Sequence, residues 1–292
     1  MIKSVLKGLY GLIPLKKEIY SALKIIWQPS EPIYRHLHFK GNIKVKVDDH
    51  RSFQMVHHGF WVENEIFWSG LNGKWEKDSL SLWIKLCPYA DVIFDIGANT
   101  GIYSLVAKTI KPSARVFAFE PIERVCEKLK QNIKLNNFDI VPVQKAASDA
   151  DGTAIIRDMN TEHIYSVTVN AKKEEGDGRD VETVIQITKL DTFIRENNIT
   201  KVDLLKIDVE THEPEVMEGF KEFLFRFRPA ILIEILNTEV GDRINKVMEG
   251  SGYWYYNINE QGGVKKSDKI TQSDFYNFLL CTPEMARKIG LN

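Results

Sequence analysis

The most constraining feature of this 292-residue sequence is an apolar stretch that ends in a glycine-containing turn. Residues 92–96 read Val-Ile-Phe-Asp-Ile, and residues 97–101 read Gly-Ala-Asn-Thr-Gly. A second apolar stretch, 117–119, ends on Glu120 and Pro121. In an α/β sheet, glycines after one strand let the backbone approach a ligand, and an acid ending the next strand binds ribose hydroxyls. The sequence therefore predicts a nucleoside pocket.

The glycine spacing indicates which nucleoside fits. A dinucleotide site needs G-x-G-x-x-G, whose backbone N–H groups face a pyrophosphate, whereas this turn has only Gly97 and Gly101. Asp95 precedes the turn, where a carboxylate repels a diphosphate but attracts an ammonium or a sulfonium. S-adenosylmethionine carries both cations and no phosphate. These residues argue against a nicotinamide dehydrogenase, and a tight turn followed by an incidental glutamate is the alternative without function.

Downstream segments, taken with this turn, resemble a known family. They are residues 95–101, 119–121, 132–136, 147–149, 190–193, 204–210 and 228–235. In order and spacing they resemble the FkbM family of class I S-adenosylmethionine-dependent O-methyltransferases, from about residue 92 to residue 235. Many members have a glycine and a small residue before a glutamate, where this chain has Thr211-His212-Glu213. That departure leaves the identity of the general base open.

The resemblance implies the α/β fold of class I methyltransferases, a doubly wound, mostly parallel seven-stranded sheet with an antiparallel last strand. Alternating strand and helix patterns agree with this fold. Strands are expected at 92–96, 115–119, 140–143, 202–207, 230–235, 252–258 and 275–281, and helices at 76–87, 101–110, 121–136, 190–197, 213–226 and 239–250. The last two strands are expected to form a hairpin whose polar loop contains Gly262 and Gly263.

We divide the chain into an N-terminal helical and β appendage, 1–88, and an S-adenosylmethionine-binding methyltransferase domain, 89–292. The appendage is predicted to contact the acceptor or a second subunit. Residues 1–28 are lysine-rich and place apolar side chains at helical spacing. They are predicted to be one or two helices, packed on the protein itself or on a second copy, or resting on an anionic membrane surface.

Residues 39–70 alternate as strands of a small antiparallel sheet do, and we include Trp61 and Val62 in these strands. His57 and His58 then point to opposite faces, so they are not expected to share a metal. Tryptophans crowd this front part of the chain, where they either fill the core or stack on a sugar acceptor. Residues 158–181 are predicted to be a solvated hairpin loop or a flap over the acceptor site.

Composition excludes several classes of protein. The net charge is −1 and there is no arginine-rich stripe, so a nucleic-acid partner is not expected. The three cysteines are scattered, which predicts neither a disulfide framework nor a zinc site and favours a reducing cytoplasm. No apolar run reaches membrane-spanning length, and the start of the chain does not read as a signal peptide.

Ligands of open α/β sheets bind beyond the carboxyl ends of the strands. We therefore expect the first strand end to contact the methionine part of the donor, the second its ribose and the third its adenine. The predicted cofactor-binding residues are Asp95, Gly97, Asn99, Thr100 and Gly101, then Glu120, then Ser148 and Asp149.

Methyl transfer to a hydroxyl is an in-line displacement, in which the enzyme aligns the reacting atoms and a base or a metal helps to remove the proton. The predicted catalytic residues are Asp208, Glu210 and His212, which follow the fourth core strand. His212 is the first choice as base because imidazole titrates near neutral pH. No metal ligand is assigned, although Glu234 with Asp208 and Glu210 offers oxygen ligands to a divalent cation. Lys206 is expected to be buried against a carboxylate.

The sequence thus predicts an S-adenosylmethionine-dependent O-methyltransferase acting on a hydroxyl of a sugar, glycan or glycolipid. A macrolide-like natural product is the alternative acceptor. A non-catalytic S-adenosylmethionine-binding module is the alternative without chemistry, and the intact segment 208–213 argues against it.

Overall fold

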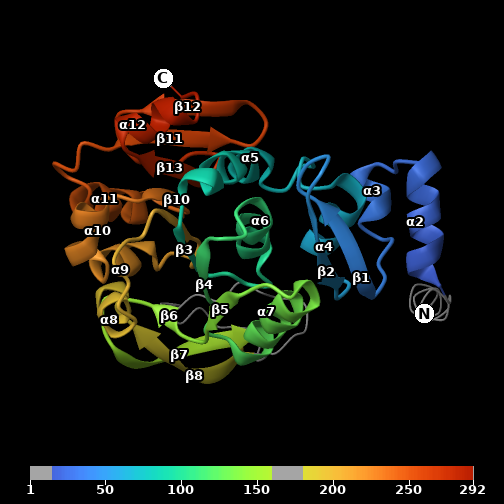
Figure 1. Cartoon of the computed structure of the whole chain (residues 1–292), viewed down its shortest axis with the longest axis horizontal. Helices are drawn as coiled ribbons and strands as arrows, with labels where there is room; N and C mark the ends of the chain where they lie inside the picture. The colour runs from blue at the N-terminus through green and yellow to red at the C-terminus, as the bar shows by residue number, and fades with distance from the viewer. Residues whose placement is uncertain (1–14, 160–179, 292) are drawn as a thin grey trace.

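The computed structural model describes residues 15–159 and 180–291, and its centre is one eight-stranded sheet (Figure 1). The strands are β3 (Val92–Ile96), β4 (Arg115–Phe119), β5 (Ile140–Val143), β9 (Leu204–Ile207), β10 (Ala230–Glu234), β11 (Trp254–Asn259), β12 (Gly263–Ser267) and β13 (Asn277–Cys281). Their order is β12-β11-β13-β10-β9-β3-β4-β5. The five strands from β5 to β10 are parallel, and β13 runs antiparallel beside β10. The predicted class I methyltransferase fold is confirmed.

The expected hairpin between the last two strands needs a correction. β11 and β13 do pair antiparallel, but the connection between them contains the additional strand β12, which pairs with β11 at the sheet edge. Gly262 lies in the β11–β12 turn and Gly263 is the first residue of β12, where a polar loop was expected. β12 reads Gly-Val-Lys-Lys-Ser, which has little of the apolar alternation that predicts a strand. The sheet therefore has eight strands where seven were expected.

Alternate residues of the parallel strands enter two different cores. Ile93 and Leu204 pack towards α5 (Lys77–Leu86), α6 (Ile102–Ile110) and α7 (Glu123–Asn136). Phe94 and Leu205 pack on the opposite face, under helices α8 (Leu190–Glu196), α9 (Glu213–Glu218), α10 (Lys221–Phe227) and α11 (Thr238–Val247). Burial on both faces explains why these strands are continuously apolar. α12 (Pro283–Lys288) ends the described chain.

A second sheet of three strands was not predicted. β6 (Ala146–Ala147), β7 (Gly152–Met159) and β8 (Asp180–Thr188) lie in the order β6-β8-β7. Ile156 and Ile185 of this sheet pack on Ile122, the residue directly before α7. The predicted loop or flap 158–181 falls mostly on residues 160–179, which lie outside the described residues.

The N-terminal part contains α2 (Lys16–Ile26), α3 (Glu31–Tyr34), an antiparallel pair β1 (Gly41–Lys46) and β2 (Ser52–His57), and α4 (Trp61–Ser69). The small antiparallel sheet is confirmed, but Trp61 and Val62 begin a helix and not a strand. The Phe60 backbone N–H donates to Glu63 Oε2 at 3.1 Å, so the glutamate closes the first turn of α4. Within residues 15–159 and 180–291, no helix is long and apolar enough to cross a bilayer.

Two asparagines of α7 attach this N-terminal part to the main sheet. Asn136 exchanges two hydrogen bonds with the Gln54 backbone of β2, each of 2.6 Å. Asn132 accepts from the Val56 N–H at 2.8 Å and donates to the Thr100 carbonyl at 2.8 Å. Side chains of α7 therefore provide hydrogen-bond partners for backbone groups of β2. Asn132 also fixes the glycine turn through the Thr100 carbonyl.

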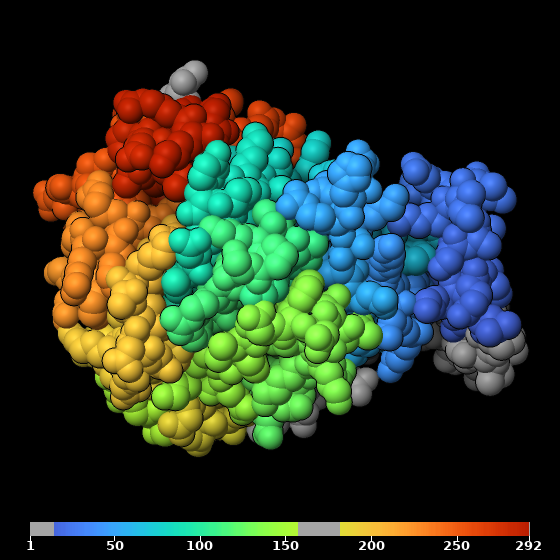
Figure 2. Space-filling model, viewed as in Figure 1, coloured from blue at the N-terminus to red at the C-terminus, as the bar shows by residue number. Residues whose placement is uncertain are grey.

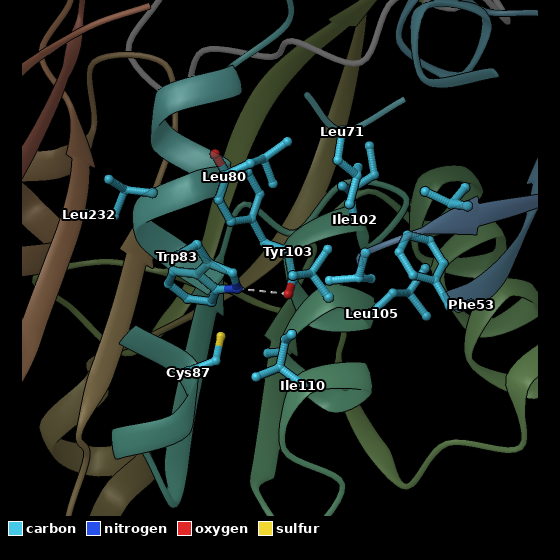
Figure 3. Close-up of a cluster of buried hydrophobic side chains, with 14 of the residues drawn as sticks. Phe53, Leu71, Leu80, Trp83, Cys87, Ile102, Tyr103, Leu105, Ile110 and Leu232 are labelled. Atoms are coloured by element: carbon cyan, nitrogen blue, oxygen red, sulfur yellow. Dashed lines mark hydrogen bonds between the residues drawn. The ribbon is translucent and has the colours of Figure 1, made fainter. Parts of the chain in front are cut away.

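The N-terminal part also shares a hydrophobic core with the rest of the protein. Figure 3 shows Phe53 of β2, Trp83 of α5 and Leu105 of α6 in one buried cluster, where Trp83 Nε1 donates to the Tyr103 carbonyl at 3.0 Å. In Figure 2 the blue N-terminal residues lie directly against the green spheres of the main body. The division at residue 88 therefore separates two parts that fold around common side chains.

We expect Asn132→Ala to lower the free energy of unfolding by about 2 to 4 kcal/mol, because it leaves a part-buried N–H and a buried carbonyl without partners. Asn136→Ala is the matched control, since its two hydrogen bonds to Gln54 are solvent-accessible and it does not reach the glycine turn. We expect it to cost about 1 kcal/mol. Urea unfolding measures both, and equal losses would contradict the linking role of Asn132.

Candidate active site

A cavity of about 410 Å³ lies at the carboxyl ends of the central parallel strands. The predicted site residues that line it are Asp95, Gly97, Asn99, Thr100, Glu120, Asp208, Glu210 and His212. Gly101, Ser148 and Asp149 do not line it. The structure thus brings the expected donor loop and the expected catalytic turn to one cavity.

Gly97 brings these two segments together. Its φ is +78°, and a Cβ at this position would lie 1.9 Å from the Asp208 carbonyl oxygen. No side chain fits there, so a glycine is required. Gly101 has a different task, because its φ of +94° starts α6 and a Cβ would lie 2.5 Å from Leu129 Cδ1 of α7. It supports the packing of α6 on α7 and does not form the cavity wall.

Hydrogen bonds hold two carboxylates of the cavity wall, Asp95 and Glu120, in position. Asp95 is 1% exposed, and its Oδ2 accepts from the Ser104 N–H at 3.0 Å and from its Oγ at 2.7 Å. Among the described residues its buried Oδ1 has no hydrogen-bond partner. Glu120 accepts from the N–H groups of Asn99 at 3.1 Å and Ile122 at 3.0 Å. The Glu120 side chain thereby fixes both the glycine turn, at Asn99, and the residue before α7, Ile122.

Lys206 is buried and paired with a carboxylate, as the sequence predicted. Its Nζ lies 2.6 Å from Asp208 Oδ2 and 4.5 Å from the centroid of the Tyr103 ring. Burial alone would lower the pKa of Lys206, but the carboxylates of Asp208, Glu76 and Asp95 outweigh it and raise this pKa. The ammonium is therefore charged and holds Asp208 at the cavity wall.

The turn after β9 has an unusual backbone. Glu210 and Thr211 have φ values of +54° and +78°, a region that side-chain-bearing residues, and β-branched ones above all, seldom adopt. Glu213 holds this turn, because its Oε1 accepts from the N–H groups of Val209 at 3.1 Å and Thr211 at 3.3 Å. A strained turn held by a buried side chain is typical of functional sites. The sequence pattern included Glu213 but did not indicate this task.

His212 lies between two protein groups. Its Nε2 is 3.0 Å from Ser148 Oγ, and its Nδ1 is 3.5 Å from Glu215 Oε2. Burial lowers the pKa of His212 against the opposing effect of the Glu215 and Asp149 carboxylates, so the neutral ring is favoured at pH 7. Ser148, expected at the adenine, thus supports His212 in this structure. The role of His212 as base stays a prediction.

Glu234 lies outside the cavity wall. Burial, followed by repulsion from Asp208 and Glu210, raises its pKa to about 9, which favours the protonated acid at neutral pH. Within residues 15–159 and 180–291, no three His, Cys, Asp or Glu side chains converge as metal ligands. The carboxylates of Asp208, Glu210 and Glu234 therefore do not form the ligand set weighed from the sequence.

The expectation that His57 and His58 are adjacent strand residues needs a correction, because β2 ends at His57 and His58 lies beyond it. His57 is buried, with its Nε2 3.3 Å from Asn64 Oδ1, and its Nδ1 accepts from the Gly59 N–H at 3.0 Å. These contacts fix the turn between β2 and α4. Burial lowers the pKa of His57 and of His58 to about 4.

The tryptophans of the described chain lie in two kinds of surroundings. Trp68 and Trp83 are buried in the core, whereas Trp61 and Trp75 line the cavity. The start of α4 also contributes Phe60 and Glu63 to the wall. No sequence pattern indicated Glu63 as a site residue, because it lies far from the glycine turn in the sequence. Only the folded structure brings it to the cavity.

The buried carboxyl group of Glu213 should make the stability of the protein depend on pH. Burial raises its pKa from 4.5 to about 7, so the neutral acid stabilises the fold fully below pH 4.5, and this stabilisation is lost as the pH rises to 7 and above. We expect Glu213→Gln, which keeps the acceptor oxygen and removes the charge, to gain stability relative to the wild type by on the order of 3 kcal/mol between pH 5 and pH 8. Denaturant unfolding at both pH values measures this change, and a constant difference would contradict it.

The chain is similar to several known methyltransferases. Over 160 residues the chain is 26% identical to the hexuronic acid methyltransferase AglP of Haloferax volcanii, covering 55% of this chain and 62% of AglP. It is 27% identical over 158 residues to the 31-O-demethyl-FK506 methyltransferase FkbM of Streptomyces tacrolimicus, covering 45% of this chain and 60% of that protein. The solved structure of methyltransferase FkbM from Methylobacillus flagellatus has a TM-score of 0.41 at 14% identity, covering 65% of this chain and 43% of that one.

The family model of the methyltransferase FkbM domain matches residues 95–255. This match spans more than half of the chain and contains the glycine turn, Glu120, Lys206 and the strained turn after β9. The chain belongs to the FkbM family of S-adenosylmethionine-dependent methyltransferases.

Proposed function

We propose that this protein transfers a methyl group from S-adenosylmethionine to a hydroxyl of a sugar, glycan or glycolipid. One observation carries the proposal. A single cavity is lined by the glycine turn and Glu120, by the turn at 208–212, and by the side chains of Trp61 and Trp75. The groups expected to bind the donor, the groups expected to react and the aromatic surfaces therefore line one cavity.

The donor-side residues fit a cationic nucleoside. We expect the buried Oδ1 of Asp95, which has no hydrogen-bond partner among the described residues, to accept an ammonium. We expect Glu120, at the cavity wall, to bind ribose hydroxyls. When bound, S-adenosylmethionine supplies an activated methyl group on a sulfonium. The apolar residues Ile122, Ala146 and Ile156, which also line the cavity, offer a surface for the adenine.

The reactive end needs a group that accepts a hydroxyl proton. Asp208 and Glu210 both line the cavity, and Lys206 holds Asp208 in place. We assign proton acceptance to this carboxylate pair, because both ring nitrogens of His212 already face protein groups. In this assignment His212 positions the turn that carries Glu210.

A sugar acceptor is favoured by the two tryptophans, since the apolar face of a sugar ring packs well on an aromatic side chain. A relative is named a hexuronic acid methyltransferase, and another is named 2-O-methyltransferase NoeI. A macrolide-like acceptor is the second candidate, because a further relative is named for 31-O-demethyl-FK506. A screen of label transfer from methyl-labelled donor to sugar nucleotides, glycolipids, polysaccharides and a macrolide tests the proposal. Transfer to the macrolide alone would contradict the sugar assignment.

We expect S-adenosylmethionine to stabilise the protein against thermal unfolding. At a concentration one hundred times its Kd, S-adenosylmethionine should raise the melting temperature by about 5 °C. Glu120→Ala should remove most of this shift, because it removes the expected ribose acceptor. Glu127→Ala is the matched control, since Glu127 is an exposed acid of α7 outside the cavity. Equal shifts in both variants would contradict the assignment of Glu120.

Proton acceptance predicts unequal losses of turnover. Asp208→Asn should lower kcat at least 100-fold, within the range of general-base effects, while the Kd of S-adenosylhomocysteine changes less than about threefold. His212→Asn should lower kcat about tenfold or less, because it acts through the turn. Initial rates with the acceptor found in the screen measure both. The reverse order would assign the base to His212, as the sequence first indicated.

A further inference from the structure

One wall of the cavity is formed by residues of the N-terminal part, to which the proposed donor site assigns no role. Phe60, Trp61, Val62, Glu63 and Trp75 form it, and all of them precede the residues matched by the family model. This wall faces a cavity that must also admit the acceptor. Its chemistry therefore bears on which acceptor fits.

Glu63 is the polar group of this wall. It is 1% exposed, and its Oε2 accepts from the N–H groups of Phe60 at 3.1 Å and His58 at 3.2 Å. Its buried Oε1 has no hydrogen-bond partner among the described residues. Burial of an oxygen without a partner is unfavourable, and a hydrogen bond from a ligand hydroxyl or amine would relieve this penalty. Burial also raises the pKa of Glu63 to about 7.

Trp61 lies two residues before Glu63, and it is 47% exposed although it lines the cavity. Trp75 lies on the same wall, with its ring centroid 6.4 Å from that of Tyr103, over which Lys206 lies. The wall thus presents one buried carboxylate and two aromatic side chains. This combination binds a ring with an apolar face and polar edges.

The charge of the reactive end restricts the acceptor further. Glu63, Asp208 and Glu210 line this region, whereas the ammonium of Lys206 is already paired with Asp208. The other lining lysine, Lys145, is adjacent to Ala146, part of the apolar cluster of Ile156 and Ile185. A carboxylate on the acceptor would meet an excess of negative charge in a poorly hydrated cavity.

We propose that Trp61, Glu63 and Trp75 form an acceptor subsite for an uncharged or amine-bearing sugar, and that this subsite discriminates against sugar acids. The inference rests on the proposed function and names the substrate class of the same cavity. It separates this chain from the relative named for a hexuronic acid.

Saturation-transfer NMR on the full chain, saturated with S-adenosylhomocysteine, tests the subsite at pH 8. The probes are methyl glucoside, methyl glucosaminide and methyl glucuronide, which differ in charge. The variants are Trp61→Ala and Glu63→Gln. Trp27→Ala is the matched control, because Trp27 is 41% exposed and does not line the cavity.

We expect the glucoside and the glucosaminide to bind at least about tenfold more tightly than the glucuronide. Trp61→Ala should weaken both about tenfold, and Trp27→Ala should leave them unchanged. Glu63→Gln, which keeps an oxygen for the two N–H groups, should weaken the glucosaminide more than the glucoside. Because Trp61 is half exposed, its variant tests the subsite even where Glu63→Gln fails to fold.

Tight binding of the glucuronide, equal binding by Trp61→Ala and the wild type, or no signal from any glycoside would overturn the subsite. Failure of the proposed function is distinguishable, because it appears as absent binding of S-adenosylhomocysteine. Donor binding without a glycoside signal contradicts the subsite and leaves the donor assignment standing.

Discussion

The close approach of Gly97 to Asp208 is the contact on which the site depends. A Cβ at residue 97 would lie 1.9 Å from the Asp208 carbonyl oxygen, so two strand ends meet with no side chain between them. The parallel pairing of β3 with β9 sets this meeting, with Asp95 opposite Lys206 in register. One missing methyl group thus allows the donor loop and the reactive turn to share a cavity.

Buried charge makes this arrangement specific. Asp95 and Lys206 lie on the same face of neighbouring strands, and Lys206 pairs with Asp208 at 2.6 Å. Replacing one member would leave an uncompensated buried charge, which costs several kcal/mol. The ammonium of Lys206 is therefore neutralised by its carboxylate partners. Asp95 Oδ1 has no hydrogen-bond partner among the described residues, so it is available to a ligand. The network tolerates a cationic donor better than an anionic one.

Sequence patterns predicted those features that depend on residues close together in the chain. The apolar strands, the glycine turn, Glu120 and the pairing of Lys206 follow from residues close together in the chain or in register. The contacts of Ser148 with His212 and of Asn132 with β2 join residues 64 and 76 positions apart, and no local pattern encodes them. Trp61 alternates like a strand residue, yet the hydrogen bond from Phe60 to Glu63 makes it helical. The position of Glu63 at the cavity wall depends on tertiary packing, which no local pattern encodes.

We propose that the cavity binds a sulfonium nucleoside and not a dinucleotide. Isothermal calorimetry of the full chain with S-adenosylmethionine and, separately, with NADH distinguishes the two ligands. We expect saturable binding of S-adenosylmethionine at one site per chain, and no measurable heat of binding with NADH, because Asp95 lines the cavity and the third glycine is absent. Saturable binding of NADH without binding of S-adenosylmethionine would contradict it.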